Sequence, residues 1–207
     1  MFLNIDGQKL SAEPGANVLE TALANDIYIP HLCHDAELRP YGGCRLCLVV
    51  VVGARGFQAA CTTIVAEGMV ITTNNAELER VRRDTLELLL AEHPLDCLVC
   101  VRNQHCELQK AVAYIGGATR NLRRTNLNEH SVELMPSFSL TREYCVLCQK
   151  CVRACDEIAR KKLLTVVDRG AKSHVATFAG QTKMMDACAN CLECVKRCPT
   201  AALQLRS

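Results

Sequence analysis

Apolar and polar positions alternate in the first stretch of the chain, residues 1–75, and predict strands arranged around one helix. Residues 2–5 and 8–10 flank Asp6-Gly7, a dipeptide typical of tight β-hairpins. Asn17 then precedes a helical pattern, with Glu20 at the capping-box position three residues later. Further β-rich runs occur at 27–29, 48–52 and 69–72. A hairpin, a helix and further strands in this order favour a small α/β unit of the β-grasp type.

The second stretch, residues 76–125, has a helical pattern. Residues 76–91 combine strong helix formers with neither Gly nor Pro, and His93-Pro94 ends the segment. A second helix is predicted over 103–114, because Gly116-Gly117 stops it. The polar and basic residues 119–140 show no clear period. They fit either an ordered connector or a flexible linker.

The third stretch, residues 126–207, contains an internal repeat. The spacing C-x2-C-x2-C-x3-C occurs once from Cys145 to Cys155 and again from Cys188 to Cys198. Two strands are predicted between the repeats, at 163–167 and 174–178, around Arg169-Gly170. We therefore predict an α+β protein with three units, bounded at 1–75, 76–125 and 126–207.

Fifteen cysteines and one histidine can be divided into four complete sets of four, with no thiol left over. An iron–sulfur cluster takes four protein ligands, nearly always thiolates. The count therefore predicts four clusters and makes electron transfer the leading function. The sets are Cys33, Cys44, Cys47 and Cys61; His93, Cys97, Cys100 and Cys106; Cys145, Cys148, Cys151 and Cys198; and Cys188, Cys191, Cys194 and Cys155.

The repeat carries the most specific signal. Three thiolates at i, i+3 and i+6 can reach three corners of a cubane, and in two-cluster ferredoxins the fourth cysteine ligates the other cluster. Cys198 is therefore assigned to the site of Cys145, and Cys155 to the site of Cys188. Asp156 departs from the pattern, because the other repeat has Pro199 at this position. Zinc is the alternative, although zinc sites usually use two separated cysteine pairs.

Basic residues near the cysteines allow two interpretations. They offset cluster charge or dock an acidic partner, or they form an ordinary solvated face. These residues are Arg80, Arg82 and Arg83 before His93, Arg160, Lys161 and Lys162 after Cys155, and Lys196 and Arg197 before Cys198. No G-x-G-x-x-G or P-loop motif is present, and every cysteine is already assigned. We therefore predict no catalytic residue in this chain and expect the chemistry in partner subunits.

Composition narrows the class of protein. The chain has 24 Lys and Arg against 22 Asp and Glu, a balance that favours neither nucleic acid nor a membrane surface. An odd number of cysteines argues against a secreted disulfide scaffold. The first residues lack a signal-peptide pattern, and the apolar run 46–52 is too short to span a bilayer. We expect a reduced, cytoplasmic compartment with no direct membrane insertion.

Nearly the whole chain resembles a known family. The stretches that carry the resemblance are Ile29-Pro30-His31-Leu32-Cys33, Gly43-Cys44-Arg45-Leu46-Cys47-Leu48-Val49, Cys106-Glu107-Leu108-Gln109 and Cys148-Gln149-Lys150-Cys151-Val152-Arg153-Ala154-Cys155-Asp156-Glu157. With the four motifs in this order, the chain is similar to the diaphorase small subunit of cytoplasmic NAD-linked [NiFe]-hydrogenases. The N-terminal regions of the complex I large peripheral subunit and of [FeFe]-hydrogenases share the resemblance.

The resemblance implies the cluster types. The set of Cys33 corresponds to a [2Fe–2S] cluster in a β-grasp ferredoxin-like domain, with Gly42-Gly43 letting the backbone pass close to sulfur. The set of His93 corresponds to a [4Fe–4S] cluster in a small helical domain, for which His105 is the rival ligand. The two remaining sets correspond to [4Fe–4S] clusters in a bacterial two-cluster ferredoxin-like domain. His34 is interpreted as a residue at the surface or beside the first site.

The resemblance also implies partners. In that family, a flavoprotein subunit that binds FMN and NADH exchanges electrons with the small subunit, which connects it to a catalytic hydrogenase subunit. Similar chains serve formate dehydrogenases and flavin-based electron-bifurcating complexes, whose partners include soluble ferredoxin. A free polyferredoxin that diffuses between enzymes is a further alternative. The sequence separates these possibilities poorly.

Overall fold

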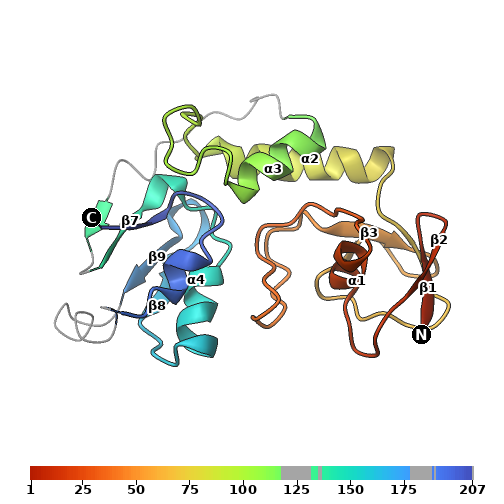
Figure 1. The fold of residues 1–207 in the computed structure, drawn as a ribbon. Coiled ribbons are helices and arrows are strands. Elements are labelled where there is room, and N and C mark those ends of the chain that lie inside the picture. Colours follow the sequence, from red (N-terminus) through yellow and green to blue (C-terminus); the bar gives the residue numbers. More distant parts are fainter. Residues whose placement is uncertain (118–131, 135–136, 178–187, 189, 207) are drawn as a thin grey trace.

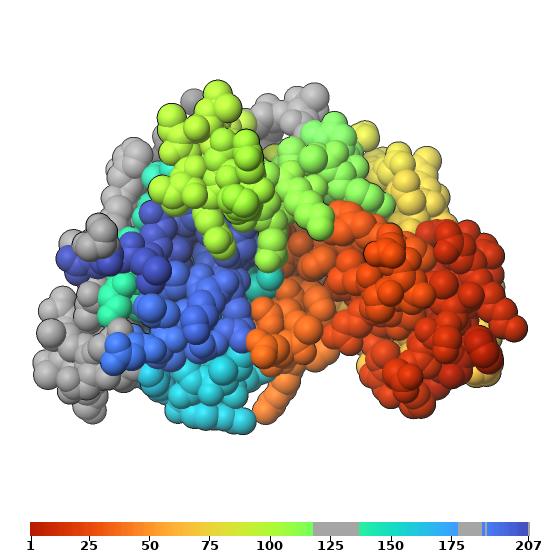
Figure 2. Space-filling model, viewed as in Figure 1, coloured from red at the N-terminus to blue at the C-terminus, as the bar shows by residue number. Residues whose placement is uncertain are grey.

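The computed structural model describes residues 1–117, 132–134, 137–177, 188 and 190–206, with the backbone alone for 132–134. Figure 1 shows an N-terminal part built around one sheet, a C-terminal part of short strands and helices, and two helices that lie across both. In the space-filling view the N-terminal and C-terminal parts meet beneath the segment around residue 100 (Figure 2). The predicted connector at 119–140 lies largely outside the described residues.

The N-terminal sheet has five strands in the order β2-β1-β5-β3-β4. β1 pairs antiparallel with β2 and parallel with β5, so the sheet is mixed. The strands are β1 (Phe2–Ile5), β2 (Gln8–Ser11), β3 (Leu48–Val51), β4 (Gln58–Ala59) and β5 (Val70–Thr72). The predicted hairpin is confirmed, and it turns through left-handed Asp6 and Gly7, with φ values of 51° and 85°. The β4 strand was not predicted.

Helix α1 (Val18–Ala24) packs on this sheet. The Asn17 side chain caps it by accepting a hydrogen bond from the Glu20 N–H at 2.9 Å, as the sequence predicts. Residues 27–29 form no strand, which corrects that expectation. Pro30 follows them and has no N–H to give to a sheet. Ile29 is nevertheless fully buried in the core below α1.

Two helices follow the sheet, α2 (Ala76–Ala91) and α3 (Glu107–Ile115). The bounds of α2 match the prediction, and its buried face is Leu78, Arg82, Leu86 and Leu90. The other helix begins at Glu107 rather than 103, because Gln104 is left-handed at φ 67° and Cys106 is extended. It ends at left-handed Gly116, as predicted. A separate core joins both helices to Leu32 and Leu46, which precede Cys33 and Cys47.

The C-terminal part holds a three-stranded sheet, β10-β7-β6, and a two-stranded sheet, β8-β9. The strands are β6 (Val132–Leu134), β7 (Phe138–Thr141), β8 (Leu164–Val167), β9 (His174–Thr177) and β10 (Leu203–Leu205). The helical segments are η1 (Arg142–Tyr144), α4 (Lys150–Arg153), the π-helix η2 (Ala154–Ile158), η3 (Gly170–Lys172) and α6 (Glu193–Lys196). The predicted strand pair β8-β9 is present, whereas β6, β7 and β10 were not predicted.

Among the described residues, no helix is both long and apolar enough to cross a bilayer. The mixed sheet with its helix, followed by the helical segment, agrees with a [2Fe–2S] ferredoxin-like domain and an adjoining iron–sulfur binding region.

Candidate metal centres

The first set lies where the N-terminal sheet meets the loop before β3. Cys33, Cys47 and Cys61 are each 1% exposed. The Sγ atoms of Cys47 and Cys61 are 3.4 Å apart, and the Cys44 N–H points at the Cys33 Sγ at 3.5 Å. Hydrogen bonds from the Cys44 and Cys61 thiols lower the pKa of Cys33, whereas the pKa of Cys44 is raised. The four thiols therefore share one buried environment.

Gly42 and Gly43 form the backbone that leads directly into Cys44 of this set. Gly42 is left-handed at φ +68°. A Cβ on Gly43 would lie 2.0 Å from the Tyr41 ring, so the ring occupies the space of a side chain. His34 is buried rather than at the surface, and its Nε2 lies 3.7 Å from the Glu20 carboxylate.

The second set lines a cavity of about 400 Å³ between α2, α3 and the loop joining them. His93, Cys97, Cys100 and Cys106 all line it. His93 is 8% exposed, whereas His105 is exposed and lies outside the lining residues. The His93 ring also packs edge-on against Tyr144, with centroids 5.7 Å apart. Of the two candidate histidines, the structure brings His93 to the three cysteines.

The third and fourth sets line two small cavities in the C-terminal part. Cys145, Cys148 and Cys151 line one cavity together with Cys198. Cys188, Cys191 and Cys194 line the other together with Cys155. The fourth cysteine of each repeat thus lies with the first three of the other repeat. Burial raises the pKa of the Cys145 thiol to about 11 and that of Cys194 to about 12. A bound cation must therefore offset the thiolate charge before these groups ionise at neutral pH.

The loops that carry the cysteines share an unusual backbone conformation. Arg45, Leu147, Gln149 and Leu192 are left-handed, with φ between 50° and 58°, and each lies between two cysteines of one set. Such a conformation costs a non-glycine residue about 1–3 kcal/mol and persists where the surroundings dictate it. Gln149 and Leu192 hold equivalent positions in the two repeats, with ψ angles of 14° and 11°. The sequence repeat is therefore a structural repeat.

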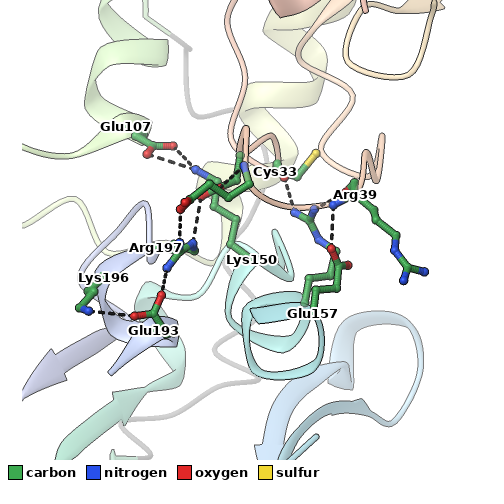
Figure 3. Close-up of polar contacts among 11 residues, drawn as sticks. Cys33, Arg39, Glu107, Lys150, Glu157, Glu193, Lys196 and Arg197 are labelled. Atoms are coloured by element: carbon green, nitrogen blue, oxygen red, sulfur yellow. Dashed lines mark hydrogen bonds and ion pairs between the residues drawn. The ribbon is translucent and has the colours of Figure 1, made fainter. Parts of the chain in front are cut away.

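Salt bridges and hydrogen bonds connect the sets to one another. Two of the charged residues involved, Lys150 and Arg153, belong to α4 (Figure 3). Lys150, beside Cys151, is 4% exposed and lies 2.9 Å from the carboxylate of Glu107, which is next to Cys106. Arg153 donates hydrogen bonds to the backbone carbonyls of Cys33 and Arg39.

Arg102 belongs to the loop of the second set and donates a hydrogen bond at 2.5 Å to the Cys198 carbonyl, in the third set. Sequence reasoning missed Arg102, Lys150 and Arg153. Their position within two residues of a cysteine was the signal that could have identified them.

The basic residues noted in the sequence separate into distinct roles. Arg197 pairs with Asp35, Glu37 and Glu193, so it joins the N-terminal loop to α6. Arg82 is buried and hydrogen-bonded to three carbonyls. Arg80, Arg83 and Arg160 are exposed, as a solvated face would be.

Each set fits the group that the sequence predicts for it in number and kind of donor. Within the described residues, no three Cys, His, Asp or Glu side chains converge closely enough to hold a single metal ion. The sets are therefore defined by the environment or cavity that their members share. When bound, iron–sulfur clusters supply one-electron redox chemistry.

Family models match two parts of the chain. A model described as a 2Fe-2S iron-sulfur cluster binding domain matches residues 2–76. A model described as the NADH-ubiquinone oxidoreductase-G iron-sulfur binding region matches residues 82–120.

Similar proteins cover nearly the whole chain. The NADH-quinone oxidoreductase G 2 subunit of Rhizobium meliloti (strain 1021) is 38% identical over 97% of this chain and 23% of its own length. NADP-reducing hydrogenase subunit HndD of Solidesulfovibrio fructosivorans is 33% identical over 98% of this chain and 36% of its own length. The chain thus spans between about a quarter and a third of these relatives.

A solved structure matches the full length of this chain. A chain in the crystal structure of NAD+-reducing [NiFe]-hydrogenase in the H2-reduced state is 31% identical, with a TM-score of 0.87, over 100% of this chain and 87% of that one. The chain therefore belongs to the family of iron–sulfur subunits that includes this NAD+-reducing [NiFe]-hydrogenase chain and part of the G-type NADH-quinone oxidoreductase subunits.

Proposed function

We propose that this chain is an electron-transfer subunit with one [2Fe–2S] and three [4Fe–4S] clusters. It works between a flavoprotein that oxidises or reduces NAD(H) and a catalytic subunit, for which a hydrogenase is the first candidate. The observation that carries the proposal is that the members of each ligand set share one pocket or one buried environment. The full length of this chain also matches a chain of a hydrogenase structure.

The proposed ligands are the four sets named from the sequence. Cys33, Cys44, Cys47 and Cys61 hold the [2Fe–2S] cluster in a domain over 1–75. His93 and three cysteines hold a [4Fe–4S] cluster in a helical domain over 76–125. The two crossed sets hold the other [4Fe–4S] clusters in a two-cluster ferredoxin-like domain over 126–207. The crossed ligation is supported by the shared cavities, because Cys198 lines one cavity with Cys145 and Cys155 lines the other with Cys188.

Contacts within the chain hold the four proposed clusters in position relative to one another. Salt bridges and hydrogen bonds from α4 hold the loop of Cys33 and the loop of Cys106 against the third set. Because these contacts involve residues next to the proposed ligands, they fix the spacing between clusters. Burial of the cysteines excludes water and lowers the local dielectric constant, which is one of the factors that sets the reduction potential.

Iron analysis tests the proposal directly. Anaerobically purified protein should contain about 14 iron atoms per chain and show both [2Fe–2S] and [4Fe–4S] EPR signals on reduction. Colourless protein, or protein with zinc in place of iron, contradicts it. Purification from the native cell addresses the partners. Co-isolation with a flavoprotein and a hydrogenase supports the subunit role, whereas a stable monomer identifies a free polyferredoxin.

Two substitutions test the ligands. His93→Cys should retain a [4Fe–4S] cluster at a lower potential, because a thiolate adds one negative charge, whereas the control His105→Cys should change nothing. Cys155→Ser should damage the cluster of Cys188, Cys191 and Cys194. Loss of the neighbouring cluster alone would refute the crossed ligation.

A further inference from the structure

Arg82 is a buried cation behind the first ligand set. It lies on α2 and is 2% exposed. Its Nε donates a hydrogen bond to the Leu46 carbonyl at 3.2 Å, and its Nη2 donates to the carbonyls of Leu48 at 2.6 Å and Thr73 at 2.8 Å. The guanidinium therefore reaches from α2 to both ends of the segment that carries Cys47.

The burial of this charge requires compensation. An ionised side chain taken out of water is costly unless an opposite charge balances it. Within the described residues, no carboxylate lies within ion-pairing distance of Arg82, and the carboxylates of Asp6 and Glu79 act on it only from farther away. Backbone carbonyls satisfy its hydrogen bonds, but they supply only partial negative charge.

The first ligand set adds further negative charge beside Arg82 when its cluster is bound. The two carbonyls that accept from Arg82, those of Leu46 and Leu48, belong to the residues on either side of Cys47. The Cys47 Sγ lies 3.4 Å from the Cys61 Sγ, in the interior of the set. Four thiolates around a [2Fe–2S] core give a net negative charge, and reduction adds one more. A fixed cation behind Cys47 therefore favours the reduced form.

We propose that Arg82 is a positioning and tuning residue for the [2Fe–2S] cluster: its buried guanidinium, held on the carbonyls that flank Cys47, is the counter-charge of the cluster and raises its reduction potential. This inference rests on the proposed function, because it requires a cluster on Cys33, Cys44, Cys47 and Cys61. It assigns to one residue of α2 a role that the neighbouring arginines do not have.

The test uses the full chain, purified anaerobically with its clusters, in four variants. Arg82→Gln removes the charge and keeps hydrogen-bond donors, whereas Arg82→Lys keeps the charge. Arg80→Gln and Arg83→Gln remove equal charges from exposed positions on the same helix. The measurement is a redox titration of the [2Fe–2S] EPR signal, which gives the reduction potential of the cluster. If Arg82 had a purely structural role, this potential would not change.

Arg82→Gln should lower the reduced-to-oxidised ratio at least tenfold at the wild-type midpoint, a shift of about 59 mV for one electron. Arg82→Lys should stay within threefold of wild type, and both exposed controls should match wild type. An unchanged potential in Arg82→Gln overturns the proposal, and so does an equal shift in Arg82→Lys. If Arg82→Gln loses its cluster, Arg82→Lys tests the proposal alone. A reduced-to-oxidised ratio within threefold of wild type supports it, and a larger change overturns it. Absence of a [2Fe–2S] signal in wild type contradicts the proposed function instead.

Discussion

Replacing Leu86 with Ala tests the core that joins the first two ligand sets. Leu86 is fully buried on α2, in a cluster with Leu32, Leu46, Leu90 and Leu108. Since Leu32 precedes Cys33 and Leu46 precedes Cys47, this core holds two cysteines of the first set. Leu108 follows Cys106 by two residues, so the same core supports the second set.

The residues around Leu86 determine how much unfolding free energy the Leu86→Ala variant loses. Truncating a buried leucine costs about 2.7–5.0 kcal/mol, depending on how far the site can collapse into the space left. Leu32 and Leu46 lie in loops outside helices and strands, so they can move toward the gap. We therefore expect a loss of about 3 kcal/mol, in the lower part of that range. The control is Leu88→Ala on the same helix, where Leu88 is 67% exposed and the loss should stay below about 0.5 kcal/mol.

Anaerobic urea unfolding provides the assay, monitored by circular dichroism for helix content and by visible absorbance for the clusters. With a slope of about 3 kcal/mol per molar urea, the Leu86→Ala midpoint should fall by about 1 M. The Leu88→Ala midpoint should remain at the wild-type value. Equal midpoints for the two variants would refute the view that this core supports the ligand loops.

Two further changes test contacts around the first set. Arg153→Met removes the hydrogen bonds that α4 donates to the carbonyls of Cys33 and Arg39, so amide exchange over residues 33–41 should accelerate while that of the β1-β2 hairpin stays constant. Unchanged exchange in the loop would show that these bonds do not hold it. Gly43→Ala should cost about 1–3 kcal/mol, because its Cβ would lie 2.0 Å from the Tyr41 ring, and the double variant with Tyr41→Ala should recover most of that loss in the same urea assay.

Features that depend on local sequence were predictable. Helix α2 has the predicted bounds because its sequence favours a helix throughout and Asn75 caps it, accepting from the Leu78 N–H at 2.8 Å. The hairpin at Asp6-Gly7 and the stop at Gly116 likewise depend on single residues with special backbone conformations.

Features that depend on distant partners were not predictable in the same way. Strand β10 exists because it pairs with β7, more than sixty residues earlier, and nothing within Leu203–Leu205 marks that partner. The burial of Arg82 was not predicted for a different reason. In sequence it resembles Arg80 and Arg83, yet only Arg82 shares the four-residue spacing of Leu78, Leu86 and Leu90. The position of Arg82 on the helix face of these leucines was therefore the signal in the sequence that could have indicated its burial.

The crossing of the two cysteine repeats has a consequence for biosynthesis. The first set is complete once residue 61 has been translated, and the second once residue 106 has been. The triplet that ends at Cys151 has its fourth neighbour, Cys198, in the same cavity only after another 47 residues. At about 5–20 residues per second, the ribosome needs about 2–10 s for that distance. During this interval the nascent chain presents three of these thiols without the fourth, so the cavity lined by Cys145 is complete only after residue 198 has been made, whereas the first two sets are complete earlier.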